Sequence, residues 1–362
     1  MITARLSNKK RLFVFILYVA LVFVFFEGAT RLFFSSEIIL ERIKGEDDAT
    51  RRLIWIKQHQ GRAGNRYTFD RYDALRGWAL KPDIRNMIMP GGSILNSNSM
   101  GTRGVTEYRY GKPHNKTRIL ILGDSFVFGE EVSDHETFPY YLQHILPHSE
   151  VINFGVHGYG HDQMLIGLKE EGAKYAPDIV ILGFVHGDMR RNLLKFRDYA
   201  KPKYEPARNK LILTNVPVPS PESFLRRESY RSKFYDLLTI LYSRMLLHSA
   251  AENEKMEEIT TAILDEMIKT IKNIGAVPVF AYLPYNEELE NAGEQITDKE
   301  KYFFDLCSRE NIECVSLRPY FAENAKKGVV FRKTGHWDAK GNQIAAEGLK
   351  KYLLKKFLTY PK

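Results

Sequence analysis

The sequence predicts an α/β protein: a three-layer α/β/α sandwich with a five-stranded parallel sheet, preceded by one N-terminal transmembrane helix. Three observations predict it. Short apolar runs alternate with helical stretches from residue 116 onward, most of these runs are apolar without interruption, and a long apolar segment lies near the N-terminus. Uninterrupted apolar strands are typical of a sheet covered by helices on both faces. A chain of 362 residues can bury such a core.

The N-terminal apolar segment begins with Leu12–Phe26, a run of 15 residues without a charge. This length fits either the core of a cleaved signal peptide or part of a membrane span. An uncleaved anchor over residues 12–34 is favoured, because Glu27 stands close to the small residue Ala29 that a signal peptidase would need, and because apolar residues resume afterwards. Glu27 and Arg31 are four residues apart and can pair on one helix face.

Four basic residues precede this segment and set its expected orientation. They are Arg5, Lys9, Lys10 and Arg11, and basic flanks stay on the cytoplasmic side of a membrane. We therefore expect residues 1–11 to be a cytoplasmic tail and a single span to lie in the inner (cytoplasmic) membrane. The rest of the chain is then extracytoplasmic, in the periplasm.

The remaining chain has two predicted parts. Residues 35–115 are expected to form a stalk and a lead-in segment, and the sheet domain follows at 116–362. An insertion at 195–228 interrupts the alternation of strands and helices, and its five prolines favour an extended, lid-like arm over a helix. The five predicted strands are 118–122, 151–153, 178–182, 277–283 and 314–317.

Composition narrows the function. The net charge of +9 is mildly basic without a dense Lys/Arg block, and no zinc-finger or RNA-binding signature is visible, so we expect no nucleic-acid partner. No P-loop or G-x-G-x-x-G follows a strand, so we expect no nucleotide cofactor. Cys307 and Cys314 are interpreted as two buried core residues, with a disulfide between them as the less favoured alternative.

Chemistry-bearing residues follow the predicted strands directly. Gly123-Asp124-Ser125 comes after the first strand, glycine-rich turns follow the second and third, and His336 lies beyond the fifth. Because the carboxyl ends of parallel strands meet at one edge of the sheet, we expect these residues to converge. Acyl transfer through a serine needs a nucleophile, a base that takes its proton, and N–H donors for the oxyanion.

Ser125 taken alone could be no more than a helix cap. The α/β-hydrolase elbow G-x-S-x-G does not fit, because Val127 stands at the second glycine position. The glycine turn before Ser125 and the histidine beyond the last strand together favour a nucleophile over a cap.

From about Asp70 to the C-terminus, the chain resembles the SGNH (GDSL-type) hydrolases, in particular their membrane-anchored bacterial members. The resemblance rests on six stretches in the family's order: "DALRGWALKPD", "NSMGTRG", "ILGDSFVFGEEVSDHETFP", "VINFGVHGYG", "YAPDIVILGF" and "GHWDAKGN". It implies a flavodoxin-like fold, no metal, no cofactor, and ester-bond chemistry directed at acylated carbohydrates or lipids.

The resemblance also assigns roles to single residues. Ser125 would be the nucleophile, its own N–H and that of Gly158 would hold the oxyanion, and His336 would be the base. Apart from these assigned roles, we expect three carboxylates to support the site: Asp124, Asp188 and Asp338.

Two places depart from the family's pattern. Gly187 stands where the family usually has an Asn whose side chain is the third oxyanion donor, and losing one such donor costs roughly a hundred- to a thousandfold in rate. Lys333 and Thr334 stand where the family usually has the Asp that orients the histidine, and Asp338 follows the histidine instead.

Other side chains at these turns have more than one interpretation. Asn192 or His186 is a hypothetical replacement for the missing oxyanion donor. Arg190 and Arg191 are interpreted as solvated, with contact to an anionic substrate as the alternative. A metal site is a minor hypothesis beside structural or substrate-contacting histidines; its candidate ligands would be His157, His161, His186, Asp162 and Asp188.

These observations predict an extracytoplasmic serine esterase or O-acyltransferase acting on acyl esters, with acetyl as the expected acyl group. Hydrolase and transferase differ only in whether water or a sugar hydroxyl takes the acyl group. The expected partners are an acylated small molecule or cell-envelope polysaccharide, the lipid bilayer through residues 12–34, and an acyl-donor membrane protein. The alternative is a non-catalytic glycan-binding or scaffold protein of the same fold, which Gly187 and Lys333 favour.

Overall fold

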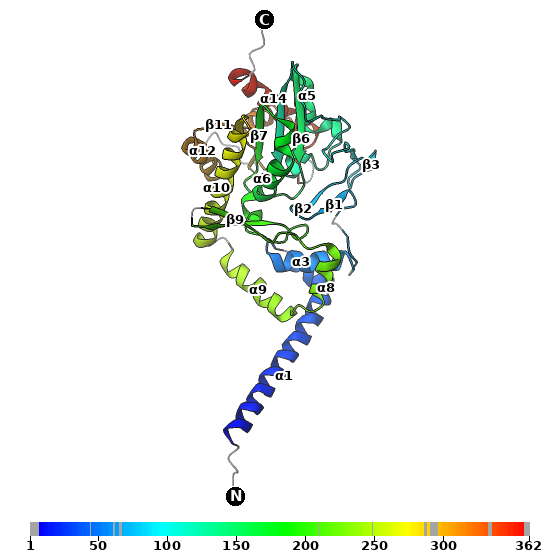
Figure 1. Ribbon diagram of the computed structural model, residues 1–362, viewed down its shortest axis with the longest axis vertical. Helices are drawn as coiled ribbons and strands as arrows, with labels where there is room; N and C mark the ends of the chain where they lie inside the picture. Colours follow the sequence, from blue (N-terminus) through cyan, green and yellow to red (C-terminus); the bar gives the residue numbers. More distant parts are fainter. Residues whose placement is uncertain are drawn as a thin grey trace. The chain divides into compact units, whose positions relative to one another are not determined.

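The computed structural model describes residues 7–43, 45–60, 62–64, 67–208, 210–247, 249–285, 288–289, 296–331 and 335–357 (Figure 1). The chain divides into two compact units. We call them the helical unit, made of Met1–Gly64, Phe196–Tyr199 and Ser220–Glu252, and the sheet unit, made of Asn65–Lys195, Ala200–Pro219 and Asn253–Lys362.

A parallel sheet forms the centre of the sheet unit. Its strands are β5 (Thr117–Gly123), β6 (Ser149–Gly155), β7 (Ile179–Phe184), β10 (Val277–Tyr282) and β11 (Glu313–Ser316). Their order is β11-β10-β7-β5-β6, and every neighbouring pair is parallel. Counted along the chain, this is the order 2-1-3-4-5 of flavodoxin-like folds. The predicted fold class is confirmed.

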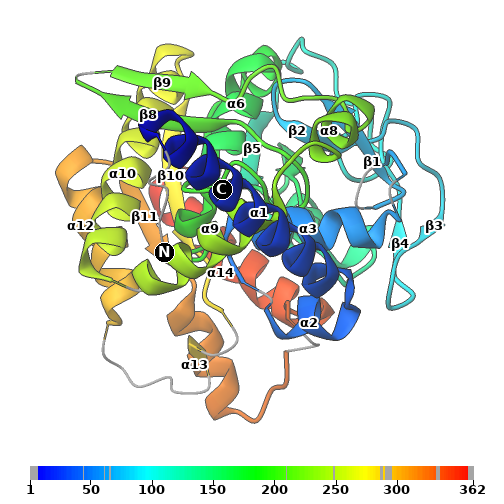
Figure 2. The ribbon, with the colours of Figure 1, turned by 90° about the horizontal axis from the view of Figure 1, so that it is seen from below.

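Helices cover both faces of the sheet (Figure 2). Successive strand residues point to opposite faces. On one face, Ile119 of β5 belongs to the same core cluster as Leu349, and on the other, the Tyr282 ring packs against Phe303 at 5.5 Å. The helices are α5 (Phe138–Ile145), α6 (His161–Glu170), α10 (Ala250–Asn273), α12 (Asp298–Glu310), α13 (Arg318–Lys326) and α14 (Ala339–Lys356).

The lead-in segment contains two short antiparallel pairs. β1 (Asp70–Asp73) pairs with β2 (Gly77–Leu80), and β3 (Met87–Ile88) pairs with β4 (Ile94–Leu95). Apolar side chains of this segment cluster with Phe128, which ends the short helix α4 (Ser125–Phe128) directly after β5. The segment therefore supports the helix that carries Ser125.

The insertion at 195–228 is extended in its first half and helical in its second. β8 (Lys203–Ala207) and β9 (Lys210–Thr214) form an antiparallel hairpin in the sheet unit. In the helical unit, α8 (Pro221–Glu228) begins where the Ser220 hydroxyl accepts a hydrogen bond from the Ser223 N–H. A proline is tolerated in a first helical turn, because its missing N–H would have no partner in the helix there. The expectation of an arm without a helix is therefore wrong from Pro221 onward.

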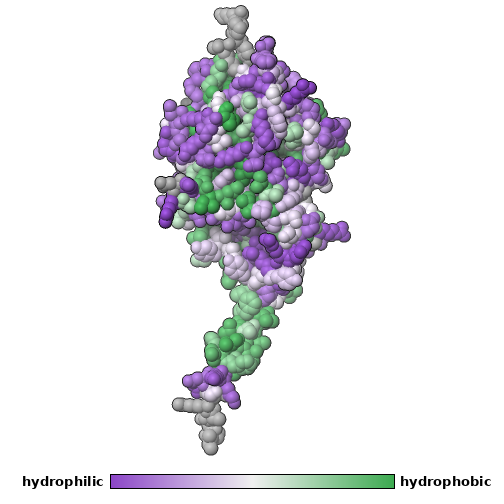
Figure 3. All heavy atoms as spheres, viewed as in Figure 1, coloured by the Kyte–Doolittle hydropathy of each residue, from purple (hydrophilic) through white to green (hydrophobic). Residues whose placement is uncertain are grey.

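The helical unit is built around α1 (Asn8–Ser35), which contains the predicted span and is long and apolar enough to cross a membrane. Green apolar side chains cover the surface of this helix in Figure 3. The predicted pair of Glu27 and Arg31 is present at 2.8 Å. The other helices of the unit are α2 (Glu37–Arg42), α3 (Asp48–Gln58) and α9 (Lys233–Leu246).

Buried ion pairs tie the helical unit together. Arg52 of α3 lies 3.0 Å from the Glu228 carboxylate and also pairs with Asp236 of α9. Around Trp55 of the same helix pack the rings of Phe196, Tyr199 and Phe224. These contacts join segments that are between 141 and 184 residues apart in the sequence.

The two cysteines of the sheet unit are bonded to each other. Cys307 lies in α12 and Cys314 in β11, with their Cα atoms 6.3 Å apart, a separation that a disulfide can bridge. The favoured interpretation of two free core residues is therefore wrong. The turn from α12 into β11 brings the two side chains together. A spacing of seven residues does not by itself indicate a disulfide, so the sequence did not reveal this contact.

Candidate active site

Ser125 is the first residue of α4 and directly follows β5 and Asp124. The cap of α4 is made by Asp124, whose carboxylate accepts a hydrogen bond from the Phe126 N–H at 2.9 Å. The Ser125 hydroxyl instead lies 2.8 Å from Nε2 of His336, with a longer contact of 3.3 Å to the Asp124 carboxylate. Asp124 therefore caps α4, and the Ser125 hydroxyl is directed at His336. The interpretation of Ser125 as the cap is wrong.

Close packing places α4 against the sheet. A Cβ atom built on Gly123 would lie 2.1 Å from a methyl group of Val127, and one built on Gly155 would lie 2.3 Å from the Phe128 nitrogen. Any side chain at these two positions would push α4 away from the strands. The glycines at the ends of β5 and β6 therefore allow the close approach that sets the height of Ser125 above the sheet.

His336 lies between Ser125 and a carboxylate. Its Nδ1 atom is 3.4 Å from an oxygen of Glu131, and its Nε2 atom is 3.9 Å from an oxygen of Glu130. The imidazole also packs on the Phe126 ring at 5.0 Å. Sequence reasoning missed both glutamates, because they follow α4 in the turn and do not precede the histidine. The two adjacent acids in "FGEEV" were the only signal.

A buried arginine holds the turn that carries Glu131. Arg103 donates hydrogen bonds of 2.6 Å to the carbonyl oxygens of Phe128, Gly129 and Val132 and pairs with Asp134 at 2.9 Å. Since three backbone carbonyls share one guanidinium, the turn has little freedom to move. Arg103 belongs to the stretch "NSMGTRG", so this stretch contributes to the site by fixing the turn that carries Glu131.

Asp338, a predicted supporting carboxylate, caps a helix in the structure. Its carboxylate accepts a hydrogen bond from the Gly341 N–H at 2.9 Å and caps the long helix α14. Lys333 and Thr334, the two departures before the histidine, lie outside the described residues. Within the described ranges, the carboxylates found next to His336 are those of Glu130 and Glu131.

The predicted supporting carboxylates Asp124 and Asp188 share one arginine. Nη1 of Arg191 lies 3.1 Å from Asp124 and 2.5 Å from Asp188, and it donates to the Tyr159 carbonyl at 2.9 Å. Burial alone would lower the pKa of Arg191, but the two carboxylates raise it overall. The interpretation of Arg191 as solvated is wrong, because only 11% of its side chain is exposed.

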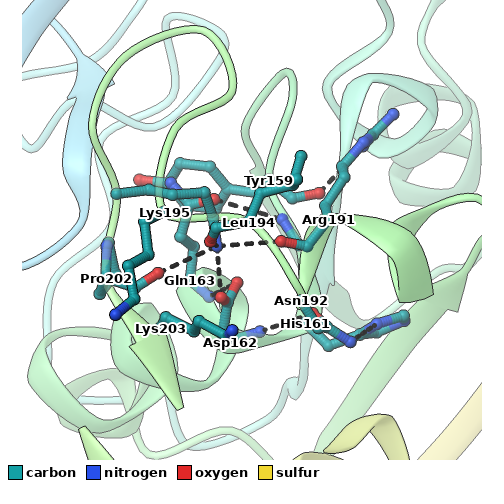
Figure 4. Close-up of polar contacts among 12 residues, drawn as sticks. Tyr159, His161, Asp162, Gln163, Arg191, Asn192, Leu194, Lys195, Pro202 and Lys203 are labelled. Atoms are coloured by element: carbon teal, nitrogen blue, oxygen red, sulfur yellow. Dashed lines mark hydrogen bonds and ion pairs between the residues drawn. The ribbon is translucent and has the colours of Figure 1, made fainter. Parts of the chain in front are cut away.

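A second buried ion pair fixes the loops behind these residues (Figure 4). The ammonium group of Lys201 pairs with the Asp162 carboxylate and donates to the carbonyl oxygens of Arg191, Leu194 and Pro202 at 3.2, 3.3 and 3.0 Å. Both charged side chains are fully buried. Lys201, two residues before β8, thus holds the backbone after β7 at Arg191 and Leu194.

Asn192, a hypothetical oxyanion donor, uses its amide elsewhere. It donates to Nδ1 of His161 at 3.1 Å and to the Thr260 hydroxyl at 2.9 Å. His161 is buried against Phe184, and burial lowers its pKa to about 3. Nε2 of His157 forms a hydrogen bond of 2.8 Å with the Asp70 carboxylate. Among the residues that the structure describes, no cluster of His, Cys, Asp and Glu could hold a metal ion.

The space beside Gly187 is filled by a tyrosine. A Cβ atom built on Gly187 would lie 2.1 Å from the hydroxyl oxygen of Tyr285. Tyr285 follows β10, and its ring packs on Phe126 at 5.6 Å. A polar group from another strand end therefore occupies the position where a side chain of residue 187 would begin. Sequence reasoning missed Tyr285, because nothing in "YLPYN" marks it.

Gly158 lies in the turn after β6, with a φ angle of +72° that favours glycine. The turn is held on both sides of it. The Trp78 indole donates to the His157 carbonyl at 3.0 Å, and the Tyr159 hydroxyl donates to the Trp78 carbonyl at 2.5 Å. The predicted donor thus sits in a fixed turn at the carboxyl edge of the sheet.

Together, these contacts define a class of site: a serine paired with a histidine at the carboxyl edge of a flavodoxin-like sheet. No family model and no curated protein matches the sequence. Among solved structures, the chain is similar to a lipolytic protein of the G-D-S-L family from Desulfitobacterium hafniense, at 14% identity over 65% of this chain and 99% of that one, with a TM-score of 0.41.

Two further solved structures extend the comparison. A member of the same family from Veillonella parvula is 11% identical over 67% of this chain and 98% of its own, with a TM-score of 0.40. An acetylxylan esterase from Geobacillus stearothermophilus is 14% identical over 69% of this chain and 100% of its own, with a TM-score of 0.41. At these identities, the likeness to the three solved structures concerns the fold alone.

Proposed function

We propose that the chain is a serine esterase of the SGNH type, with Ser125 as the nucleophile and His336 as the base. The observation that carries this proposal is the 2.8 Å separation of the Ser125 hydroxyl from Nε2 of His336. In the reaction, His336 takes the hydroxyl proton while Oγ attacks the ester carbonyl. The imidazolium then gives that proton to the leaving alcohol as the ester C–O bond breaks. A water molecule, deprotonated by His336, attacks the acyl carbon, and His336 returns the proton to Oγ as the acyl–Oγ bond breaks and the acid leaves.

In this proposal, Glu131 is the acid that orients His336. Its carboxylate lies 3.4 Å from Nδ1, on the opposite side of the ring from Ser125. A carboxylate there favours the tautomer with a proton on Nδ1 and stabilises the imidazolium that forms during attack. A Ser125–His336–Glu131 triad thus replaces the arrangement that Lys333 and Thr334 do not provide.

Three donors would bind the oxyanion: the backbone N–H groups of Ser125 and Gly158 and the hydroxyl of Tyr285. Tyr285 is included because its oxygen lies where the side chain of residue 187 would begin. A tyrosine hydroxyl carries one hydrogen and can donate it to a developing negative charge. The site then keeps three donors although Gly187 lacks a side chain.

The substrate we propose is an acyl ester, with acetyl as the group and a cell-envelope carbohydrate as its carrier. This rests on the resemblance to membrane-anchored members of the family and on α1, which could hold the enzyme at the membrane. With its basic flank in the cytoplasm, the site would lie in the periplasm. Transfer to a sugar hydroxyl would use the same residues, with the sugar in place of water.

The test is hydrolysis of p-nitrophenyl acetate by the full chain in detergent micelles. Ser125→Ala removes the nucleophile, and Ser229→Ala, which changes an exposed serine in the helical unit, is the matched control. We expect the first variant to lose the activity of the wild type and the second to keep it. Equal activity in the wild type and Ser125→Ala would instead favour a glycan-binding protein that lost its chemistry.

A further inference from the structure

Helix α9 of the helical unit exposes a long apolar face. Only Asp236 and Ile240 of its 14 residues are buried. Large apolar side chains on its exposed side are Tyr235 (59% exposed), Leu238 (48%), Leu241 (51%), Tyr242 (64%), Met245 (82%) and Leu246 (38%). A continuous apolar helix face of this kind marks a surface that contacts something other than water.

The start of α9 is fixed to α1 where the apolar run of α1 ends. The Glu27 carboxylate accepts hydrogen bonds from the Ser232 hydroxyl at 2.7 Å and from the Lys233 and Phe234 N–H groups at 3.1 and 3.0 Å. The Phe234 ring stacks on Phe26 at 5.2 Å. Glu27 is the first charged residue after Leu12–Phe26, so α9 begins at the level where the uncharged part of α1 stops.

The burial of α1 changes at the same level. Large apolar side chains of Leu12–Phe26 are mostly exposed. Beyond Glu27, Thr30 and Phe34 are buried, while Leu32 (76%) and Phe33 (40%) remain exposed. On the side of Thr30 and Phe34, the exposed apolar surface of α1 therefore ends shortly after Glu27. The exposed face of α9 continues from that boundary.

We propose that α9 lies on the lipid surface as a second membrane contact beside α1. Leu238 and Met245 would enter the outer part of the acyl chains, and Tyr235 and Tyr242 would lie at the headgroups, where amphipathic rings are enriched. Arg226 and Arg227, both exposed in the last turn of α8, add a positive charge that suits anionic headgroups. This inference rests on the proposal that α1 crosses a membrane.

The test measures lipid contact at single positions in the full chain. Each of Met245, Leu238, Leu21 and Val330 is replaced in turn by Cys and labelled with an environment-sensitive nitrobenzoxadiazole dye, because Cys307 and Cys314 are already bonded to each other. The protein is reconstituted in vesicles of phosphatidylethanolamine and phosphatidylglycerol that carry a doxyl quencher either near the headgroup or deep in the chain. Leu21 reports on α1, and the exposed Val330 of the sheet unit is the control.

We expect the shallow quencher to reduce fluorescence at Met245 and Leu238 and the deep quencher to reduce it at Leu21, with Val330 unchanged. Quenching at Leu21 without any at Met245 and Leu238 would overturn the contact of α9 and leave the anchor intact. No quenching at Leu21 would remove the anchor and the inference with it. A blue-shifted, unquenched dye at Met245 would show that protein covers this face, which also overturns the proposal.

Discussion

Around Ser125, each neighbouring polar group has a separate task. Asp124 caps α4 and pairs with Arg191, so the serine hydroxyl is left to His336. The imidazole then has a second nitrogen whose partner decides its tautomer and its basicity. The structure offers Glu131 for that place at 3.4 Å, with Glu130 on the other side of the ring.

Glu131→Gln should lower kcat for ester hydrolysis on the order of 10²- to 10⁴-fold, with a smaller effect on KM, because the imidazolium loses its stabilising charge. Glu130→Gln, a neighbour in the same turn, should have a much smaller effect. Steady-state kinetics with p-nitrophenyl acetate measure both variants. The triad would be refuted by the reverse order, with Glu130→Gln damaging and Glu131→Gln harmless.

Tyr285→Phe should lower kcat by about 10²- to 10³-fold, the typical loss of one oxyanion donor. The phenyl ring keeps its packing on Phe126, so the melting temperature should stay close to that of the wild type. Tyr320→Phe, a half-buried tyrosine in α13, serves as the matched control. Since removing the Tyr285 ring opens space at Gly187, the pair Gly187→Asn with Tyr285→Ala should recover part of the lost rate. Full activity in Tyr285→Phe would exclude the hydroxyl from the oxyanion site.

Among the structural elements, the segments that follow β6 and β7 are held together by the fully buried ion pair of Lys201 and Asp162. Lys201→Met should destabilise the protein by about 3–5 kcal/mol, because it leaves the Asp162 carboxylate buried without its cation. Lys169→Met is the control, since Lys169 pairs with Glu266 at the surface at 2.6 Å and such pairs contribute about 0–1 kcal/mol. Urea denaturation compares the two variants. Similar losses in both would contradict the role of the buried pair.

His161 at the start of α6 makes stability depend on pH. Burial lowers its pKa in the folded protein from 6.5 to about 3, so between these values the unfolded chain binds the extra proton. The contribution of His161 to the free energy of unfolding should therefore be fully present above pH 6.5. It should fall as the pH drops below 6.5, by at most about 1.4 kcal/mol per pH unit. His186, whose pKa burial lowers to about 4, adds a slope of the same sign.

Denaturation of the wild type and His161→Asn at pH 7.0 and 5.5 measures this slope. The variant should lose less stability than the wild type between the two pH values, whatever its stability at pH 7.0. A steeper or equal loss in the variant would show that His161 is not buried in its neutral form.

At the scale of the whole molecule, the sheet was predictable and part of the site was not. Five short β-rich runs, most of them uninterrupted apolar stretches, predict the five strands, and Ser125 directly follows the first of them. The resemblance to the SGNH hydrolases paired Ser125 with His336, which lies 20 residues beyond the last strand. Glu131 and Tyr285 could not be identified, because their places depend on how a turn bends and how a loop packs. The sequence likewise contains no signal that 220–252 joins the N-terminal helices, since that association depends on long-range pairs such as Arg52 with Asp236.

If Ser125 is a nucleophile activated by His336, a reagent that captures activated serines should label it covalently. The full chain in detergent is treated with a fluorophosphonate, digested, and analysed by mass spectrometry, beside Ser125→Ala and the control Ser229→Ala. We expect a single adduct on the peptide that contains Ser125 in the wild type and in the control, and none in Ser125→Ala. An unlabelled wild type, or an adduct that persists in Ser125→Ala, would contradict it.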